Sequence, residues 1–198
     1  MYSLSQLQPE SGVHHDLVSE RNLRLAGLST PQWYAVTTRS RHEKRVQQQL
    51  EERLVEVFLP LYESLHRWND RTARVSLPLF PGYVFVRICL ADRLQVATVP
   101  GVVRLVGCKG YPSAIPDPEL AAVRDCWKRR IKMEPHPYLA VGRQVRIKEG
   151  PLAEMTGLLI RKKGRFRLVL SINSITRSVA VEVDAHNVEP IALRRQTA

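Results

Sequence analysis

The stretch that decides this fold reads Leu77-Pro78-Leu79-Phe80-Pro81-Gly82-Tyr83-Val84-Phe85-Val86. Pro81 restricts its φ to about −65° and Gly82 tolerates φ above zero, so the pair predicts a tight turn. In the strand that follows, Tyr83 and Phe85 point to one side of the sheet, and the two valines point to the other. Both sides are apolar. The strand is therefore either buried on both faces within the core, or one of its faces is covered by a partner.

Composition limits what the rest of the chain can be. The chain has 198 residues, of which 44% are hydrophobic, and this suffices for one folded domain or two small ones. No apolar run approaches the ~20 residues that cross a bilayer, and no secretory signal is present, so we expect a cytoplasmic protein without a membrane partner. The net charge of +11 predicts a polyanionic neighbour such as nucleic acid or the ribosome.

The sequence offers no pattern for catalysis or metal binding. Its three cysteines, Cys89, Cys108 and Cys126, are widely spaced and form no CxxC pair, and its six histidines are scattered. There is no P-loop and no GxGxxG stretch. We therefore expect no enzyme, no metal and no cofactor.

The segment before the aromatic stretch predicts a strand followed by a helix. Trp33–Thr38 is typical of a strand. Ser40 and Glu43 then match a capping box, in which Ser40 caps a helix over 40–54 and the Glu43 side chain reaches back to it. The apolar stripe of that helix consists of three residues at intervals of four: Val46, Leu50 and Leu54.

Strands and helices alternate up to residue 130. We expect strands at 57–62 and 102–106, a short helix at 91–99, and a basic hairpin tip around 69–71. A further helix begins where Asp117 caps it and Pro118 occupies its first position. The expected buried face of that helix consists of Leu120, Val123, Trp127 and Ile131.

Two prolines divide the chain near residue 135. We expect a linker at 131–139, because proline cannot join a helix or a central strand. Five short strands then predict a small barrel over 140–192, with a turn at Gly150-Pro151 and a close backbone approach at Gly157. Residues 1–30 are expected to be a flexible leader, 31–130 a first domain, and 193–198 a tail.

Together these motifs resemble the NusG family of transcription elongation factors. The Gly150-Pro151 turn and Gly157 resemble the KOW motif; Trp33-Tyr34, the aromatic stretch and Pro100-Gly101-Val102 resemble the family's amino-terminal NGN domain. The resemblance implies an α+β fold, with an NGN-type antiparallel sheet flanked by helices and then a small, SH3-like KOW β-barrel. The Leu77–Pro81 stretch looks closer to the specialised RfaH-like and UpxY-like paralogues than to housekeeping NusG.

The resemblance implies a factor that binds RNA polymerase and modulates pausing and termination, as an operon-specific antiterminator. It would dock on the clamp helices of the polymerase β′ subunit. The residues that the resemblance assigns to this contact, called the docking residues below, are Phe58, Phe80, Pro81, Tyr83 and Phe85. One face of the strand would then stay half covered until the polymerase completes it.

Basic residues would contact the non-template DNA strand through salt-dependent interactions. These residues, called the basic cluster below, are Arg39, Arg41, Lys44 and Arg45. In relatives the KOW domain binds Rho or a small-subunit ribosomal protein, but here residues 174–178 replace the usual Phe-Gly-Arg. The β-branched pattern at 179–183 favours a strand in every state. The rival interpretation is an RNA-binding, ribosome-associated KOW-domain protein.

Overall fold

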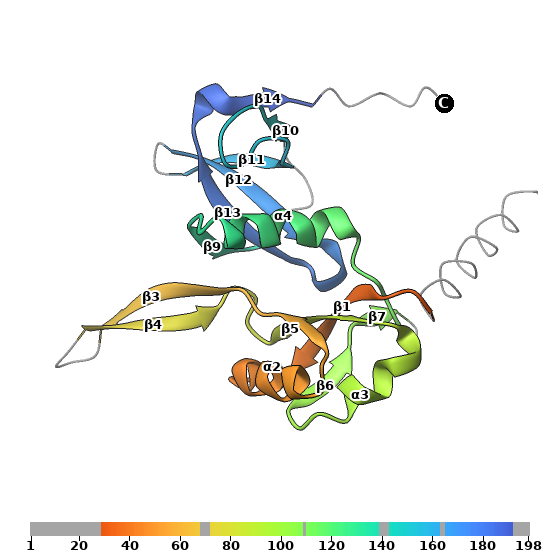
Figure 1. Ribbon diagram of the computed structural model, residues 1–198. Helices are drawn as coiled ribbons and strands as arrows, with labels where there is room; N and C mark the ends of the chain where they lie inside the picture. Colours follow the sequence, from red (N-terminus) through yellow and green to blue (C-terminus); the bar gives the residue numbers. More distant parts are fainter. Residues whose placement is uncertain (1–28, 68–71, 109, 139–142, 163–164, 192–198) are drawn as a thin grey trace, which may run out of the picture.

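The computed structural model describes residues 29–67, 72–108, 110–138, 143–162 and 165–191 (Figure 1). The expected leader, apart from Ser29 and Thr30, and the expected tail at 193–198 lie outside these residues. The described part of the chain forms two larger sheets and two two-stranded hairpins, and helix α4 lies between the two larger sheets (Figure 1).

The first sheet has four antiparallel strands in the order β2-β5-β1-β6. They are β1 (Gln32–Thr38), β2 (Glu56–Phe58), β5 (Tyr83–Ile88) and β6 (Val102–Leu105). The central pair is in continuous register, with Thr37 opposite Tyr83 and Ala35 opposite Phe85. The strand of the aromatic stretch, β5, is therefore one of the two inner strands of the sheet, which agrees with its apolar character on both faces.

Two helices cover one face of this sheet, α2 (Glu43–Glu52) and α3 (Arg93–Ala97), the latter preceded by the short helix η1 (Leu90–Asp92). The cluster beneath them contains Val84 and Val86 from β5, together with Val46 and Leu50 from α2. The predicted alternation along β5 is confirmed, because Phe85 belongs to the hydrophobic cluster on the opposite face.

The predicted start and end of the first helix are wrong. Helix α2 begins at Glu43, after His42, and no side chain caps it. It ends at Glu52, so Leu54 is not part of the apolar stripe; Leu54 has φ of +61° and is 95% exposed. The Ser40–Glu43 spacing matches a capping box, but Glu43 is used elsewhere, as described below.

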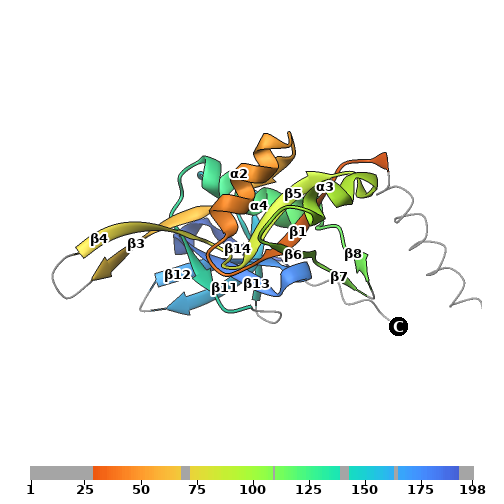
Figure 2. The same cartoon turned by 90° about the horizontal axis from the view of Figure 1, so that it is seen from below.

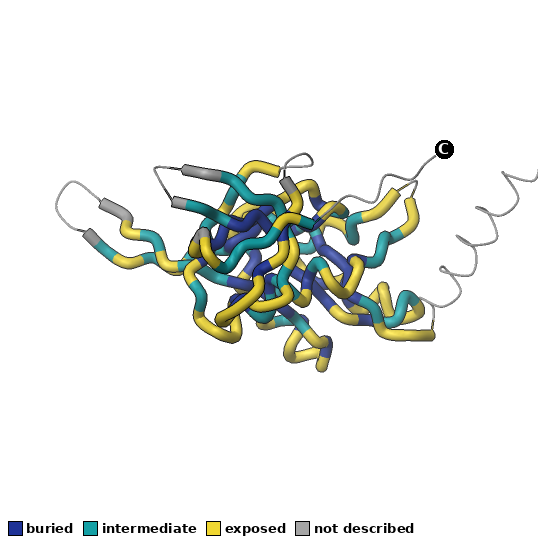
Figure 3. The backbone as a smooth tube through the Cα atoms, turned by 90° about the horizontal axis from the view of Figure 1, so that it is seen from above, coloured by how far each residue is buried: buried dark blue, intermediate teal, exposed yellow. Residues whose placement is uncertain are grey.

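A hairpin of β3 (Leu61–Arg67) and β4 (Thr72–Pro78) extends away from the first sheet (Figures 1 and 3). The expected turn at 69–71 lies outside the described residues. A second, smaller hairpin joins β7 (Gly107–Cys108) to β8 (Tyr111–Pro112).

The second sheet has six strands in the order β14-β10-β11-β12-β13-β9. Strands β11, β12, β13 and β14 of this sheet are labelled in Figure 2. They are β9 (Met133–His136), β10 (Arg143–Ile147), β11 (Thr156–Lys162), β12 (Arg165–Ile172), β13 (Arg177–Val183) and β14 (Val188–Pro190), with the short helices η2 (Asn173–Ile175) and η3 (Ala185–Asn187). Strands β10–β14 are the five short strands of the predicted KOW-type domain. Strand β9 lies in the expected linker and pairs with β13 at the sheet edge, a position that accepts proline.

The glycine predictions in this sheet are confirmed. Gly150 has φ of +89°, as the turn before Pro151 requires. A Cβ atom on Gly157 would lie 2.6 Å from the carbonyl oxygen of Val169 on β12. Only glycine therefore allows β11 and β12 to approach so closely.

Helix α4 (Asp117–Lys128) contacts both sheets. Its N-cap is Pro116 without a side-chain hydrogen bond, so the predicted cap by Asp117 is wrong. Its fully buried residues are Leu120, Val123 and Cys126. The helix ends before Ile131, which places that residue outside the predicted helical face.

Candidate functional site

The turn that carries the docking residues is held by its backbone and by α2. Gly82 has φ of +82°, as predicted, and the Tyr83 N–H donates to the Phe80 carbonyl oxygen at 3.1 Å. The Gly82 N–H donates to Glu43 Oε1 at 2.8 Å, and Glu43 is buried. Glu43 thus fixes the turn instead of capping its own helix.

The three phenylalanines among the docking residues pack against one another. The Phe80 ring lies edge-on to Phe85, with 5.4 Å between centroids and planes at 89°. The Phe58 ring centroid lies 6.1 Å from that of Phe85 and 5.7 Å from that of Trp127 on α4. The aromatic surface predicted from sequence is therefore one contiguous group, extended by an aromatic side chain from α4.

These rings are closed off from solvent. Phe58, Phe80 and Phe85 are 8%, 1% and 0% exposed. Tyr83 is half-buried, and Pro81 is exposed. The expectation that one face of β5 stays half covered is therefore wrong for this conformation.

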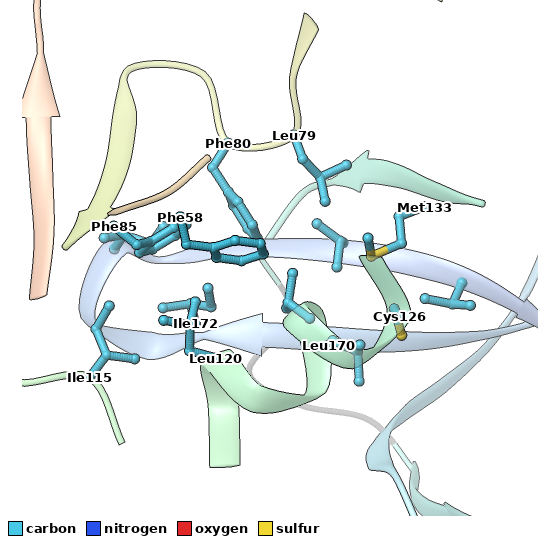
Figure 4. Close-up of a cluster of buried hydrophobic side chains, with 14 of the residues drawn as sticks. Phe58, Leu79, Phe80, Phe85, Ile115, Leu120, Cys126, Met133, Leu170 and Ile172 are labelled. Carbon is cyan, nitrogen blue, oxygen red and sulfur yellow. The ribbon is translucent and has the colours of Figure 1, made fainter. Parts of the chain in front are cut away.

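The cover comes from the chain's own later segments. Leu120 of α4 and Ile172 of β12 belong to the same hydrophobic cluster as the phenylalanines, and Figure 4 shows them beside the rings. Residues of β12 and β13 continue this cluster into the second sheet: Leu168, Leu170, Val179 and Val181. The second sheet thus occupies the position in which the sequence led us to expect a partner.

Polar contacts join α4 to the second sheet. The Glu119 carboxylate accepts two hydrogen bonds from Asn173, from its backbone N–H at 3.0 Å and its side-chain amide at 2.6 Å. The Arg129 guanidinium donates to the Pro151 carbonyl oxygen. These contacts come from both ends of α4.

A buried thiol lies at the same contact. The Cys126 Sγ is 3.7 Å from the Met155 Sδ. Burial, and secondarily the charge of Asp125, raises the pKa of the Cys126 thiol to about 11. Cys126 is therefore neutral and unreactive near pH 7.

Arg124 joins α4 to the first sheet. Its guanidinium lies 4.7 Å from the centroid of the Trp33 ring and 3.6 Å from Glu56 of β2. Sequence reasoning missed Arg124 and Glu119 as contact residues, and it placed Trp127 on the buried face of the helix although this residue is 45% exposed. Helical periodicity predicted the helix, but it does not show which two surfaces the helix joins.

The basic cluster is brought together at the start of α2. Arg39, Arg41, Lys44 and Arg45 are all exposed. The Lys44 Nζ donates to the Ser76 carbonyl oxygen of β4 at 2.9 Å, which leaves it partly engaged. The exposed guanidinium groups form a surface that can attract phosphate groups.

The altered KOW segment at 174–178 also lies at the contact between the sheets. It follows Asn173, and its Ile175 side chain is buried in the shared cluster. Thr176 has φ of +49°, which turns the chain into β13. This segment is therefore not fully accessible in the present conformation.

Within the described ranges, no group of three or more metal-ligating side chains is found. In the same ranges, no helix has the length and apolar character to cross a membrane.

Comparisons with known proteins agree on one family. A family model described as "Transcription termination factor nusG" matches residues 31–124. A protein of Halalkalibacterium halodurans named "Transcription termination/antitermination protein NusG" is 30% identical over 175 residues, which cover 80% of this chain and 98% of that protein. A Staphylococcus carnosus protein of the same name is 31% identical over 179 residues, covering 83% and 98%.

One solved structure supports the fold alone. It is titled "Domain interaction in Thermotoga maritima NusG" and has a TM-score of 0.53 and 23% identity to this chain. The match covers 82% of this chain and 98% of that chain.

Proposed function

This chain belongs to the NusG family of transcription factors, and on that premise we propose that it binds RNA polymerase in the cytoplasm and reduces pausing and termination as an operon-specific antiterminator. The observation that carries the proposal is the aromatic turn and strand, Phe80 to Phe85, whose rings pack together on the face of the first sheet opposite the one that α2 and α3 cover. Its action is binding, without chemistry. We divide the chain functionally into a polymerase-binding domain at 31–130 and a KOW domain at 140–192.

The docking residues are assigned to the polymerase β′ clamp helices. Large aromatic side chains supply much of the affinity at protein interfaces once they are removed from water. In the present conformation only Pro81 and Tyr83 are accessible. Binding through the full set of docking residues therefore requires the second sheet to move away, after which the clamp helices replace the apolar contacts of β12 and β13.

The basic cluster is assigned to the non-template DNA strand. Arg39, Arg41 and Arg45 are exposed on a side of the first sheet that α2 covers, and the second sheet lies on the other side. The two contacts can therefore be made at the same time. The KOW domain, once released, is assigned a small-subunit ribosomal protein or Rho as its partner.

Pull-down with core RNA polymerase tests the proposal. We expect Tyr83→Ala to retain less protein than wild type, and Tyr83→Ala with Phe80→Ala to retain least. Tyr111→Ala is the matched control, because this exposed tyrosine lies on β8, outside the docking residues. Circular dichroism establishes that each variant folds. Equal retention of folded wild type and double variant would reject the assigned surface.

A further inference from the structure

A groove of about 1370 Å³ is lined by the β3–β4 hairpin, the carboxyl end of α4 and β9. This volume exceeds the roughly 300–1,000 Å³ of a typical small-molecule site. Leu65 on the hairpin wall is 70% exposed, and Trp127 on the opposite wall is 45% exposed. The groove is therefore large, open and partly apolar, which fits a polymer better than a metabolite.

The lining of the groove has more basic side chains than carboxylates. Its lining contains four basic side chains, Arg74, Lys128, Arg130 and Lys132. It also contains two carboxylates, and both already have cations beside them: Glu63 lies 3.8 Å from Arg74, and Glu134 lies 2.7 Å from Arg167.

Two of the basic side chains are free to bind a ligand. Within the described ranges, no carboxylate is paired with Lys128 or Arg130, and both are exposed. Stabilisation of the α4 carboxyl terminus would explain Lys128 alone. It does not explain Arg130 and Lys132, which lie beyond the end of the helix.

The exposed indole is held in place beside these charges. Trp127 packs against Phe58 with the ring planes at 80°, and this contact fixes its orientation while nearly half of the residue stays exposed. Tyr62 of β3 lines the same groove. Aromatic rings flanked by lysine and arginine are the combination that holds unpaired bases and their phosphates.

We propose that this groove binds single-stranded nucleic acid, with a base stacked on Trp127 and phosphates contacted by Lys128 and Arg130. The site is separate from the basic cluster, which lies at the start of α2. A single strand is favoured over a duplex because only unpaired bases offer a face to Trp127. A metabolite is disfavoured by the size and openness of the groove.

Fluorescence anisotropy with the purified full chain tests the site without polymerase. The probes are labelled 12-nucleotide single strands of DNA and RNA and a duplex of equal length, each measured at several salt concentrations. We expect the single strands to bind more tightly than the duplex. Lys128→Ala with Arg130→Ala should weaken binding and reduce the slope of log K against log salt by about 1.4, that is about 0.7 for each lost contact.

Trp127 variants separate stacking from charge. Trp127→Ala should weaken single-strand binding roughly 5- to 150-fold without changing the salt slope. Trp127→Leu keeps an apolar side chain against Phe58. It should lose as much single-strand binding as Trp127→Ala, because both variants lack the ring on which a base stacks. Arg104→Ala is the charge control, because this exposed residue lies on β6, at the edge of the first sheet opposite β2.

The outcomes distinguish this site from the proposed function. Loss of binding in the Trp127 and Lys128/Arg130 variants, with Arg104→Ala unchanged, supports the groove whatever the pull-down shows. Folded groove variants that bind the oligonucleotides like Arg104→Ala overturn the proposal. If those variants lose only polymerase retention, the groove holds an acidic protein segment, and the nucleic-acid assignment is wrong.

Discussion

Replacing Glu119 by alanine should open the docking residues and strengthen polymerase binding. Glu119 makes two hydrogen bonds to Asn173, and they connect α4 to the second sheet. A hydrogen bond to a charged group contributes about 1.5–3 kcal/mol when shielded. Since Asn173 is exposed, we take about 1 kcal/mol for each bond, or about 2 kcal/mol in total.

We call the conformation described here the closed form, and the one in which the second sheet has moved away from the docking residues the open form. A loss of about 2 kcal/mol raises the ratio of open to closed molecules roughly 30-fold. A ligand that binds only the open form has an apparent dissociation constant divided by the open fraction. When the closed form dominates, Glu119→Ala should therefore bind core polymerase up to about 30-fold more tightly than wild type. Biolayer interferometry with immobilised polymerase measures this difference directly.

Asp117→Ala is the matched control for this variant. Asp117 also lies in the first turn of α4, so its removal costs the same favourable interaction with the helix dipole, but it is exposed, and the two hydrogen bonds from Asn173 go to Glu119. Adding Tyr83→Ala to Glu119→Ala should remove the gain. If Glu119→Ala and Asp117→Ala bind equally, the second sheet does not restrict access to the docking residues.

Three further predictions concern stability and reactivity. Glu43→Ala should lower the free energy of unfolding by about 1–3 kcal/mol in urea denaturation, because the Gly82 N–H loses its acceptor at a buried site. The role assigned to Glu43 is wrong if alanine at an exposed glutamate of α2 lowers the free energy of unfolding by more than Glu43→Ala does. Gly157→Ala should lower the free energy of unfolding by about 2 kcal/mol or more in the same measurement, since its Cβ would lie 2.6 Å from a carbonyl oxygen of β12. Unchanged stability would show that β11 and β12 can move apart freely. At pH 8 a thiol reagent should modify Cys108 rapidly and Cys126 slowly, because Cys108 is exposed and the pKa of Cys126 is raised to about 11. Peptide mass mapping measures both rates. Equal rates would show that Cys126 is not buried against Met155.

The sequence alone could predict features that depend on neighbouring residues. The alternation along β5 follows from strand geometry, and the positive φ at Gly82 follows from the turn that it must form. The same holds for Gly157, where an apolar strand follows a KOW-type turn. In each case the cause lies within a few residues of the effect.

Features that depend on distant contacts could not be predicted. The Ser40–Glu43 spacing satisfies a capping box, but Glu43 binds a backbone N–H that lies 39 positions away. An apolar face on β5 looks the same in sequence whether a partner or the chain itself covers it. The proline in β9 correctly argued against a central strand, but pairing at the edge depends on where β13 lies.

The docking residues are synthesised before the strands that cover them. Strands β12 and β13 follow α4 by roughly fifty residues. At about 5–20 residues per second, a ribosome needs about 3 to 10 seconds to add them. A newborn molecule therefore passes through an interval in which Phe80 and Phe85 lack the cover that β12 and β13 later provide.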